Sequence, residues 1–171
     1  VEGSVCSKCY ARKGRYRFSN VKDSLQRRFE TLNKPYWVDA FVFLIEKRKM
    51  DFFRWHDSGD LQGMGHLEKI VEIAKRSPAC KFWLPTKEIA LIREYTASGK
   101  TFPPNLTVRI SGYMIDGVAP VGFAKNRGLC VASVSPSMSK VNCTAYRTNG
   151  VCGDCRACWD KNVFEIVYKK H

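Results

Sequence analysis

Regular hydrophobic spacing begins after the first twenty residues of the chain. Apolar positions recur every three or four residues, as on one face of a helix, in four stretches. These predicted helices cover residues 19–34, 35–49, 64–78 and 88–100. Pro35 suits the first turn of the second helix, and Pro78 and Gly99 close the third and fourth.

Short apolar runs lie between these helices and predict strands. They fall within residues 50–60, 80–87, 105–117 and 128–137, with a closing strand expected within 162–171. Strands that alternate with helices at such intervals form parallel βαβ units. The pattern therefore predicts an α/β fold, either a partial or open (β/α) barrel of parallel strands or a doubly wound sheet. We expect a single domain over 1–171, with a core to residue 141 and an irregular cysteine-rich segment over 142–171.

The composition fits a folded protein outside the membrane. Of the 171 residues, 44% are hydrophobic, which argues against a disordered chain. No apolar run approaches the roughly 18 residues needed to cross a bilayer. The first residues also lack the apolar centre of a signal peptide. We therefore expect no membrane partner.

The net charge of +13 is concentrated near the N-terminus. The segment from Lys8 to Arg28 holds eight basic residues and one acidic residue, Asp23. Tyr10, Tyr16 and Phe18 are interleaved with these cations. Such a mixture can bind nucleic acid, because cations contact phosphates while aromatic rings stack on bases. A solvated basic surface explains the same pattern equally well, so both interpretations stay open.

The C-terminal cysteines carry the strongest chemical signal. Cys143, Cys152, Cys155 and Cys158 have the spacing C-x8-C-x2-C-x2-C. A CxxCxxC run is typical of an iron–sulfur cluster, because each thiolate can bind a different iron. Four thiols can also hold zinc in a tetrahedron. We predict a [4Fe–4S] cluster on these four residues, with zinc as the alternative.

The other four cysteines give weaker signals. Cys6 and Cys9 form a second CxxC pair, which suits metal binding or redox chemistry, and they are our second choice of metal ligands. Cys80 begins a predicted strand and is expected in the core, where free cysteines are often buried. The sequence does not assign Cys130. Thiols clustered in this way favour metal ligation in a reducing compartment over a disulfide framework.

Polar residues follow three of the predicted strands. The segment from Arg54 to Asp60 includes His56, Asp57 and Ser58, and later strands end in Thr86 and Lys87 and in Arg109 and Ser111. Ligands of parallel sheets bind beyond the carboxyl ends of the strands. We therefore expect a pocket on one rim. The candidate catalytic residues are His56, Asp57, Asp60, Lys87 and Arg109, and Lys87 with Arg109 would favour a small anionic ligand.

Several of these motifs together resemble a known family. The stretches "CSKCYARKGRY", "FRWHDSGDLQ", "FWLPTK", "VRISGY" and "CGDCRACWDKNVFEIVYKKH" resemble the phage "gene product 88" domain family. That family is similar in layout to radical S-adenosylmethionine proteins. The resemblance implies a bacteriophage protein in the cytoplasm of an infected bacterium, with a cysteine-bound metal centre on a barrel-like α/β scaffold. It implies no particular reaction.

One departure limits the comparison with radical S-adenosylmethionine enzymes. Their CxxxCxxC motif is absent, since the early loop holds only Cys6 and Cys9, so cleavage of S-adenosylmethionine is not expected. Our first hypothesis is an iron–sulfur protein with a pocket beside the metal. The second is a zinc-stabilised nucleic-acid-binding protein, and a third is a protein that contacts a host target through the same rim.

Overall fold

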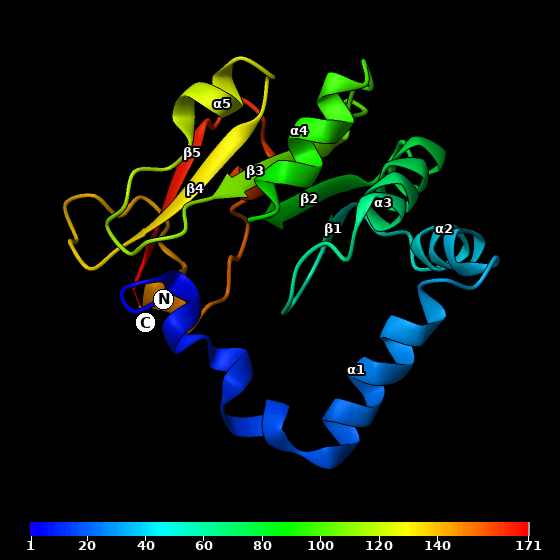
Figure 1. Ribbon diagram of the computed structural model, residues 1–171, viewed down its shortest axis with the longest axis horizontal. Coiled ribbons are helices and arrows are strands. Elements are labelled where there is room, and N and C mark those ends of the chain that lie inside the picture. The colour runs from blue at the N-terminus through cyan, green and yellow to red at the C-terminus, as the bar shows by residue number, and fades with distance from the viewer. Residues whose placement is uncertain (171) are drawn as a thin grey trace.

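Five parallel strands form one sheet in the computed structural model, which describes residues 1–170 (Figure 1). The strands are β1 (Phe52–Arg54), β2 (Lys81–Thr86), β3 (Leu106–Ser111), β4 (Cys130–Ser135) and β5 (Glu165–Lys169). Each pairs with the next along the chain, in the order β1-β2-β3-β4-β5. A doubly wound sheet reverses its strand order, and this sheet does not. The fold is an open half-barrel, as the first of the two predicted architectures requires.

Helices cover one face of the sheet. These are α3 (Met64–Arg76), α4 (Ile89–Ala97) and the short α5 (Val121–Lys125). Successive strand residues face opposite sides of a sheet, so alternate residues of β2 divide between its two faces. Phe82 and Leu84 belong to the main hydrophobic core beneath the helices, whereas Trp83 belongs to a second cluster on the other face.

The inner face of the half-barrel is covered by the connection between β4 and β5. Within the described residues this connection contains no α-helix, only the 3-10 turns η4 (Ala145–Thr148) and η5 (Ala157–Trp159). Cys158 and Ile166 join Trp83 in the second cluster. The end of the cysteine-rich segment, around Cys158, is therefore packed inside the half-barrel, whereas Cys152 and Cys155 are exposed.

The N-terminal part forms an arm beside the sheet. It begins with three 3-10 turns, η1 (Val5–Lys8), η2 (Tyr10–Arg12) and η3 (Gly14–Arg17), and continues with α1 (Ser19–Thr31) and α2 (Trp37–Lys47). Helix α2 packs on α3, whereas α1 stands away from the sheet and buries no residue. Phe18 and Phe29 are 58% and 51% exposed, so the apolar positions of this helix do not reach the core.

The hydrophobic pattern locates nine elements correctly, with ends that differ by a few residues. Helix α5 and the five 3-10 turns have no counterpart among the predicted elements, because they are too short for a hydrophobic period to emerge. None of the described helices is long and apolar enough to cross a membrane.

Candidate functional site

Asp60 connects the loop after β1 to the end of β2. Its carboxylate accepts hydrogen bonds from the Thr86 hydroxyl at 2.6 Å, from the Lys87 backbone N–H at 2.7 Å and from the Leu61 backbone N–H at 2.8 Å. Asp60 and the Thr86–Lys87 segment therefore meet on one rim, as their positions after two neighbouring strands predict.

His56 is strained and without a hydrogen-bond partner at the same rim. Its φ of 59° lies in the left-handed region, which costs energy for a side chain other than glycine. Both ring nitrogens are buried and find no partner among the described residues. The ring of His66 on α3 lies 5.4 Å away, centroid to centroid. Burial lowers the pKa of both imidazoles, that of His66 to about 4, so both rings are neutral near pH 7.

Asp57 faces the N-terminal arm. The Tyr16 hydroxyl donates to its carboxylate, and the Tyr10 hydroxyl donates to its backbone carbonyl. These contacts tie the arm to the loop after β1. Burial first and Asp57 second raise the pKa of Tyr10, so its phenol stays protonated.

Arg109 does not belong to the rim. Its side chain is 0% exposed, and all its donors are used by carbonyl oxygens in β4 and in the C-terminal segment. These are the carbonyls of Val131, Ala157, Cys158, Asp160, Val163 and Phe164, at 2.7 to 3.3 Å. The prediction that Arg109 joins Lys87 in an anion pocket is therefore wrong. The strand end is polar there because Arg109 anchors the segment that covers the inner face.

Two further polar residues of the predicted rim have different surroundings. Arg54 lies over the ring of Trp83, 4.7 Å from its centroid, and so contacts the inner cluster. Lys87 uses its backbone for Asp60 and for the Tyr113 hydroxyl. Its ammonium forms no ion pair within residues 1–170. Of the predicted rim residues, His56, Asp60, Thr86 and Lys87 come together.

The four C-terminal cysteines line one cavity of about 190 Å³. Cys158 is buried, Cys143 is half-buried, and Cys152 and Cys155 are exposed; all four thiols are free. Trp159, Val163 and Ile166 give the cavity an apolar wall. The four cysteines are therefore neighbours around one cavity, and whether they share a ligand stays a prediction.

Burial keeps the thiol of Cys158, the most buried of the four, neutral. Burial raises the pKa of Cys158, and the Tyr168 hydroxyl, 3.3 Å from its sulfur, opposes that change. Burial and then Cys158 raise the pKa of Tyr168. A bound cation would favour the thiolate instead, because metal ligation deprotonates a thiol.

The residues that line the cavity are suitable ligands for a metal group, but their side chains are not arranged around one point. Four free thiols and an apolar wall are the donor set and surroundings of an iron–sulfur cluster. The buried Trp83 indole N–H, in the same cluster as Cys158, has no acceptor within residues 1–170 and suits a sulfur acceptor. However, no three His, Cys, Asp or Glu side chains of the described chain lie close enough together to hold a metal ion.

The remaining cysteines lie elsewhere. Cys6 and Cys9 belong to the N-terminal arm, which pairs with the loop after β3 through the Val5 N–H and the Tyr113 carbonyl at 2.9 Å. They do not line the cavity of the other four. Cys80 is 1% exposed in the core, as predicted, and Cys130 is buried at the start of β4.

Three side chains at the candidate sites are not singled out by the motifs of the sequence: Tyr168, His66 and Trp83. Tyr168 shares a face with Ile166 on the closing strand, and this alternation is the signal that could have found it. His66 lies on a helix and Trp83 within an apolar run, where neither residue stands out. His66 meets His56 only because α3 packs beside β1. Trp83 meets Cys158 only because the C-terminal segment packs on the inner face.

Comparison with known proteins identifies a family. The family model described as "Gene product 88" matches residues 2–161, nearly the whole chain. No curated protein and no solved structure matches the chain.

Proposed function

This chain belongs to the gene product 88 family of bacteriophage proteins, and we propose that it is an iron–sulfur protein. Cys143, Cys152, Cys155 and Cys158 hold one [4Fe–4S] cluster against the inner face of the half-barrel. The single observation that carries the proposal is that all four thiols line the same cavity.

Binding requires the exposed part of the segment to close. Cys152 and Cys155 are exposed, so both side chains turn inwards when the cluster binds. Gly150 and Gly153, with φ values of 85° and 53°, give the backbone on either side of Cys152 a freedom that other residues lack. At the buried end of the segment, the Cys158 carbonyl accepts a hydrogen bond from Arg109, so this end needs no such movement.

The number of thiols bears on what the cluster does. A cube with four thiolate ligands has no open iron for a substrate, and its chemistry is one-electron transfer or support of the fold. We infer one of these two roles rather than cleavage of S-adenosylmethionine. The proposed location is the cytoplasm of the infected bacterium, whose reducing conditions keep thiols free.

The test is anaerobic purification followed by a visible spectrum and assays of iron, sulfide and zinc. We expect a brown protein with about four irons and four sulfides per chain. Cys155→Ser and Cys158→Ser should lose most of the iron, whereas Cys80→Ala, a core cysteine outside the cavity, should keep it. A colourless protein with one zinc would replace the cluster by a structural zinc site. Iron that survives both serine variants but disappears in Cys9→Ser would overturn the ligand assignment.

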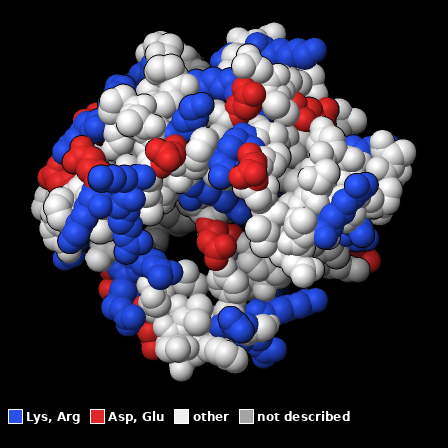
Figure 2. Space-filling view, turned by 180° about the vertical axis from the view of Figure 1, so that it is seen from behind, with Lys and Arg blue, Asp and Glu red and all other residues white. Residues whose placement is uncertain are grey.

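A second candidate function is nucleic-acid binding by the N-terminal arm, with the metal supporting the fold. The observation that favours it is the exposure of α1, whose basic residues have no carboxylate partner within residues 1–170. Figure 2 shows Lys and Arg side chains over this part of the molecule, and a hollow between it and the sheet. Exposed Phe18 and Phe29 would supply stacking surfaces.

A further inference from the structure

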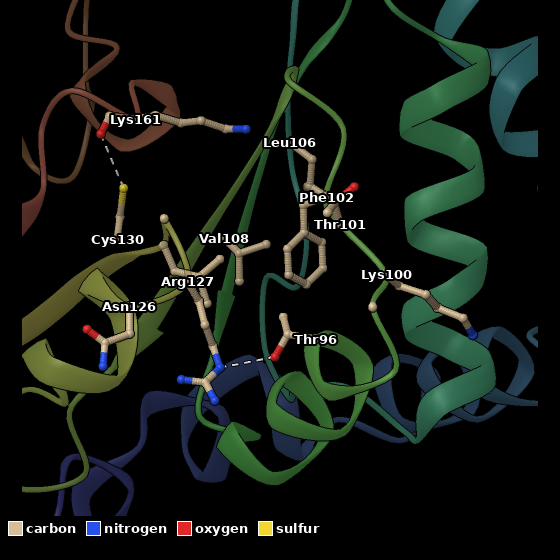
Figure 3. Close-up of a pocket in the computed structure, with 13 residues that line it drawn as sticks. Thr96, Lys100, Thr101, Phe102, Leu106, Val108, Asn126, Arg127, Cys130 and Lys161 are labelled. Atoms are coloured by element: carbon tan, nitrogen blue, oxygen red, sulfur yellow. Dashed lines mark hydrogen bonds between the residues drawn. The ribbon is translucent and has the colours of Figure 1, made fainter.

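A second cavity lies at the opposite end of the sheet from the rim. It has a volume of about 340 Å³ and is bounded by the starts of β3 and β4 and by the C-terminal ends of α4 and α5 (Figure 3). Ligand pockets of proteins begin at about this size. It shares no lining residue with the cysteine cavity, so it is a separate site.

Two cations line this cavity without a carboxylate partner. None of the described residues that line it is Asp or Glu. Lys100 is already paired with Glu68 at 2.6 Å, but Arg127 and Lys161 form no ion pair within residues 1–170. Two positive side chains at one cavity raise its affinity for anions.

Arg127 is held in place with donors to spare. Its Nε donates to the Thr96 hydroxyl at 3.1 Å, and one terminal nitrogen donates to the Phe123 carbonyl at 3.4 Å. The guanidinium also lies over the Phe123 ring, 4.2 Å from its centroid. Its second terminal nitrogen makes no hydrogen bond within the described chain, so it is available to a ligand. A planar guanidinium fixed in this way suits a carboxylate or phosphate.

Lys161 reaches the cavity from the C-terminal segment. Its ammonium donates to the Pro103 carbonyl at 3.1 Å, which leaves two N–H donors. Burial lowers the pKa of this ammonium, and the neighbouring Cys130 opposes the change. A partly desolvated cation gains more from an anion than one in open solvent does.

The wall between these two cations is apolar. Phe102, Leu106, Val108 and Leu129 line it, and Figure 3 shows Phe102 and Val108 between Lys161 and Arg127. Leu106 and Val108 are almost fully buried strand residues, so this wall is a rigid part of the core.

We propose that this cavity binds a small organic anion, with its carboxylate or phosphate group on the guanidinium of Arg127 and its apolar body on Phe102 and Val108, while Lys161 adds positive charge at the far end of the apolar wall. The site is independent of the cysteine cavity and of the proposed cluster. It also differs from the predicted anion site on the rim, since it uses neither Lys87 nor Arg109.

The test is isothermal titration of the purified protein with three probes that share one apolar body: naphthoate, naphthyl phosphate and naphthalenemethanol. We expect the two anions to bind and the neutral alcohol to bind at least about tenfold more weakly, because it loses the charged hydrogen bonds. The tighter of the two anions identifies the acidic group. Shifts of the Thr96 and Arg127 amide resonances on binding would place the probe in this cavity.

Four variants test the assignment. Arg127→Gln should weaken binding of the preferred anion roughly tenfold. Lys161→Gln should weaken it by less, because Lys161 acts across the apolar wall without contacting the acidic group. Thr101→Trp, at the exposed edge of the cavity, should block binding while keeping both cations. Arg48→Gln removes an exposed cation far along the chain and should change nothing. Circular dichroism checks that each variant is folded. Equal affinity for the alcohol and the acids, no binding of any probe, or equal losses in Arg48→Gln and Arg127→Gln would overturn the proposal.

Discussion

The guanidinium of Arg109 on β3 donates a hydrogen bond of 2.7 Å to the carbonyl oxygen of Val163, 54 residues further along the chain. The same side chain binds five other carbonyl oxygens and has no exposed surface. A buried cation usually needs a carboxylate, and here six carbonyl dipoles replace it. Arg109 thereby fixes the cysteine-rich segment on the inner face of the half-barrel, although that segment has no α-helix to hold its shape.

Replacement of Arg109 should be among the most destabilising single changes in this protein. Arg109→Gln leaves several buried carbonyls without a donor, and we expect a loss of about 3 kcal/mol or more in the free energy of unfolding. Arg109→Lys should also be destabilising, because an ammonium has fewer donors and no planar fork. Urea unfolding measures both. Arg156→Gln, on the exposed part of the same segment, is the matched control and should stay within about 0.5 kcal/mol of the wild type. A wild-type midpoint for Arg109→Gln would contradict the anchoring role.

The cysteines of the metal-free protein should react in the order of their exposure. Cys152 and Cys155 are exposed and should be alkylated first by iodoacetamide. Cys80 is buried, and burial raises its pKa to about 11, so its rate should be far lower at pH 8 and should rise about tenfold for each pH unit up to that pKa. Peptide mass spectrometry at several times gives each rate separately. Labelling of Cys80 at the rate of Cys155 would show that the core is open.

Acid should destabilise the fold through His66. Burial lowers its folded-state pKa to about 4, whereas the unfolded chain binds this proton near pH 6.5. The unfolded state therefore holds more protons between these two values, and stability is lost as pH falls from about 6.5 towards 4. Because the ring is partly exposed, we expect a contribution of about 1 kcal/mol. His66→Gln removes the titrating group and keeps an acceptor for the Gln62 N–H.

The measurement is the urea midpoint of the wild type and of His66→Gln at pH 7.5 and at pH 4.5. The variant should lose less stability on acidification than the wild type does. Identical losses would show that His66 is not held neutral in the folded protein. His56 is expected to act in the same direction, since burial lowers its pKa as well.

Nucleic-acid binding by the arm should depend on salt and on α1. If the arm contacts phosphates, affinity for a labelled oligothymidylate should fall steeply with added salt. The double variant Arg27→Gln with Arg28→Gln should lower the slope of log affinity against log salt by about two, one for each lost phosphate contact. Phe29→Ser should weaken binding with little change in that slope. Fluorescence anisotropy gives both quantities, with Arg48→Gln as the control. Binding that is absent, or unchanged in the double variant, would leave α1 without this role.

The alternation of helices and strands by itself determined that this is a parallel α/β protein. The spacing of apolar residues reflects local backbone geometry, so it located every strand and every helix longer than five residues within residues 1–170. Position after a strand likewise predicted that His56, Asp60 and Lys87 share a rim, because parallel strands place their carboxyl ends at one edge. The cysteine spacing likewise indicated one shared region, and all four of these cysteines line one cavity, although their side chains are not gathered as metal ligands.

Tertiary structure alone decided which polar residues line a cavity or rim and which support the fold. Arg109 follows the same strand-end rule as Lys87, yet the β4–β5 connection covers it and accepts most of its hydrogen bonds. Leu25 and Phe29 have the spacing of a buried helix face, yet no residue of α1 is buried. The cavity that contains Arg127 and Lys161 is lined by segments that are far apart in the sequence and adjacent only in the fold. Each of these outcomes depends on contacts between distant segments, and a local pattern carries no information about what a residue will meet across the fold.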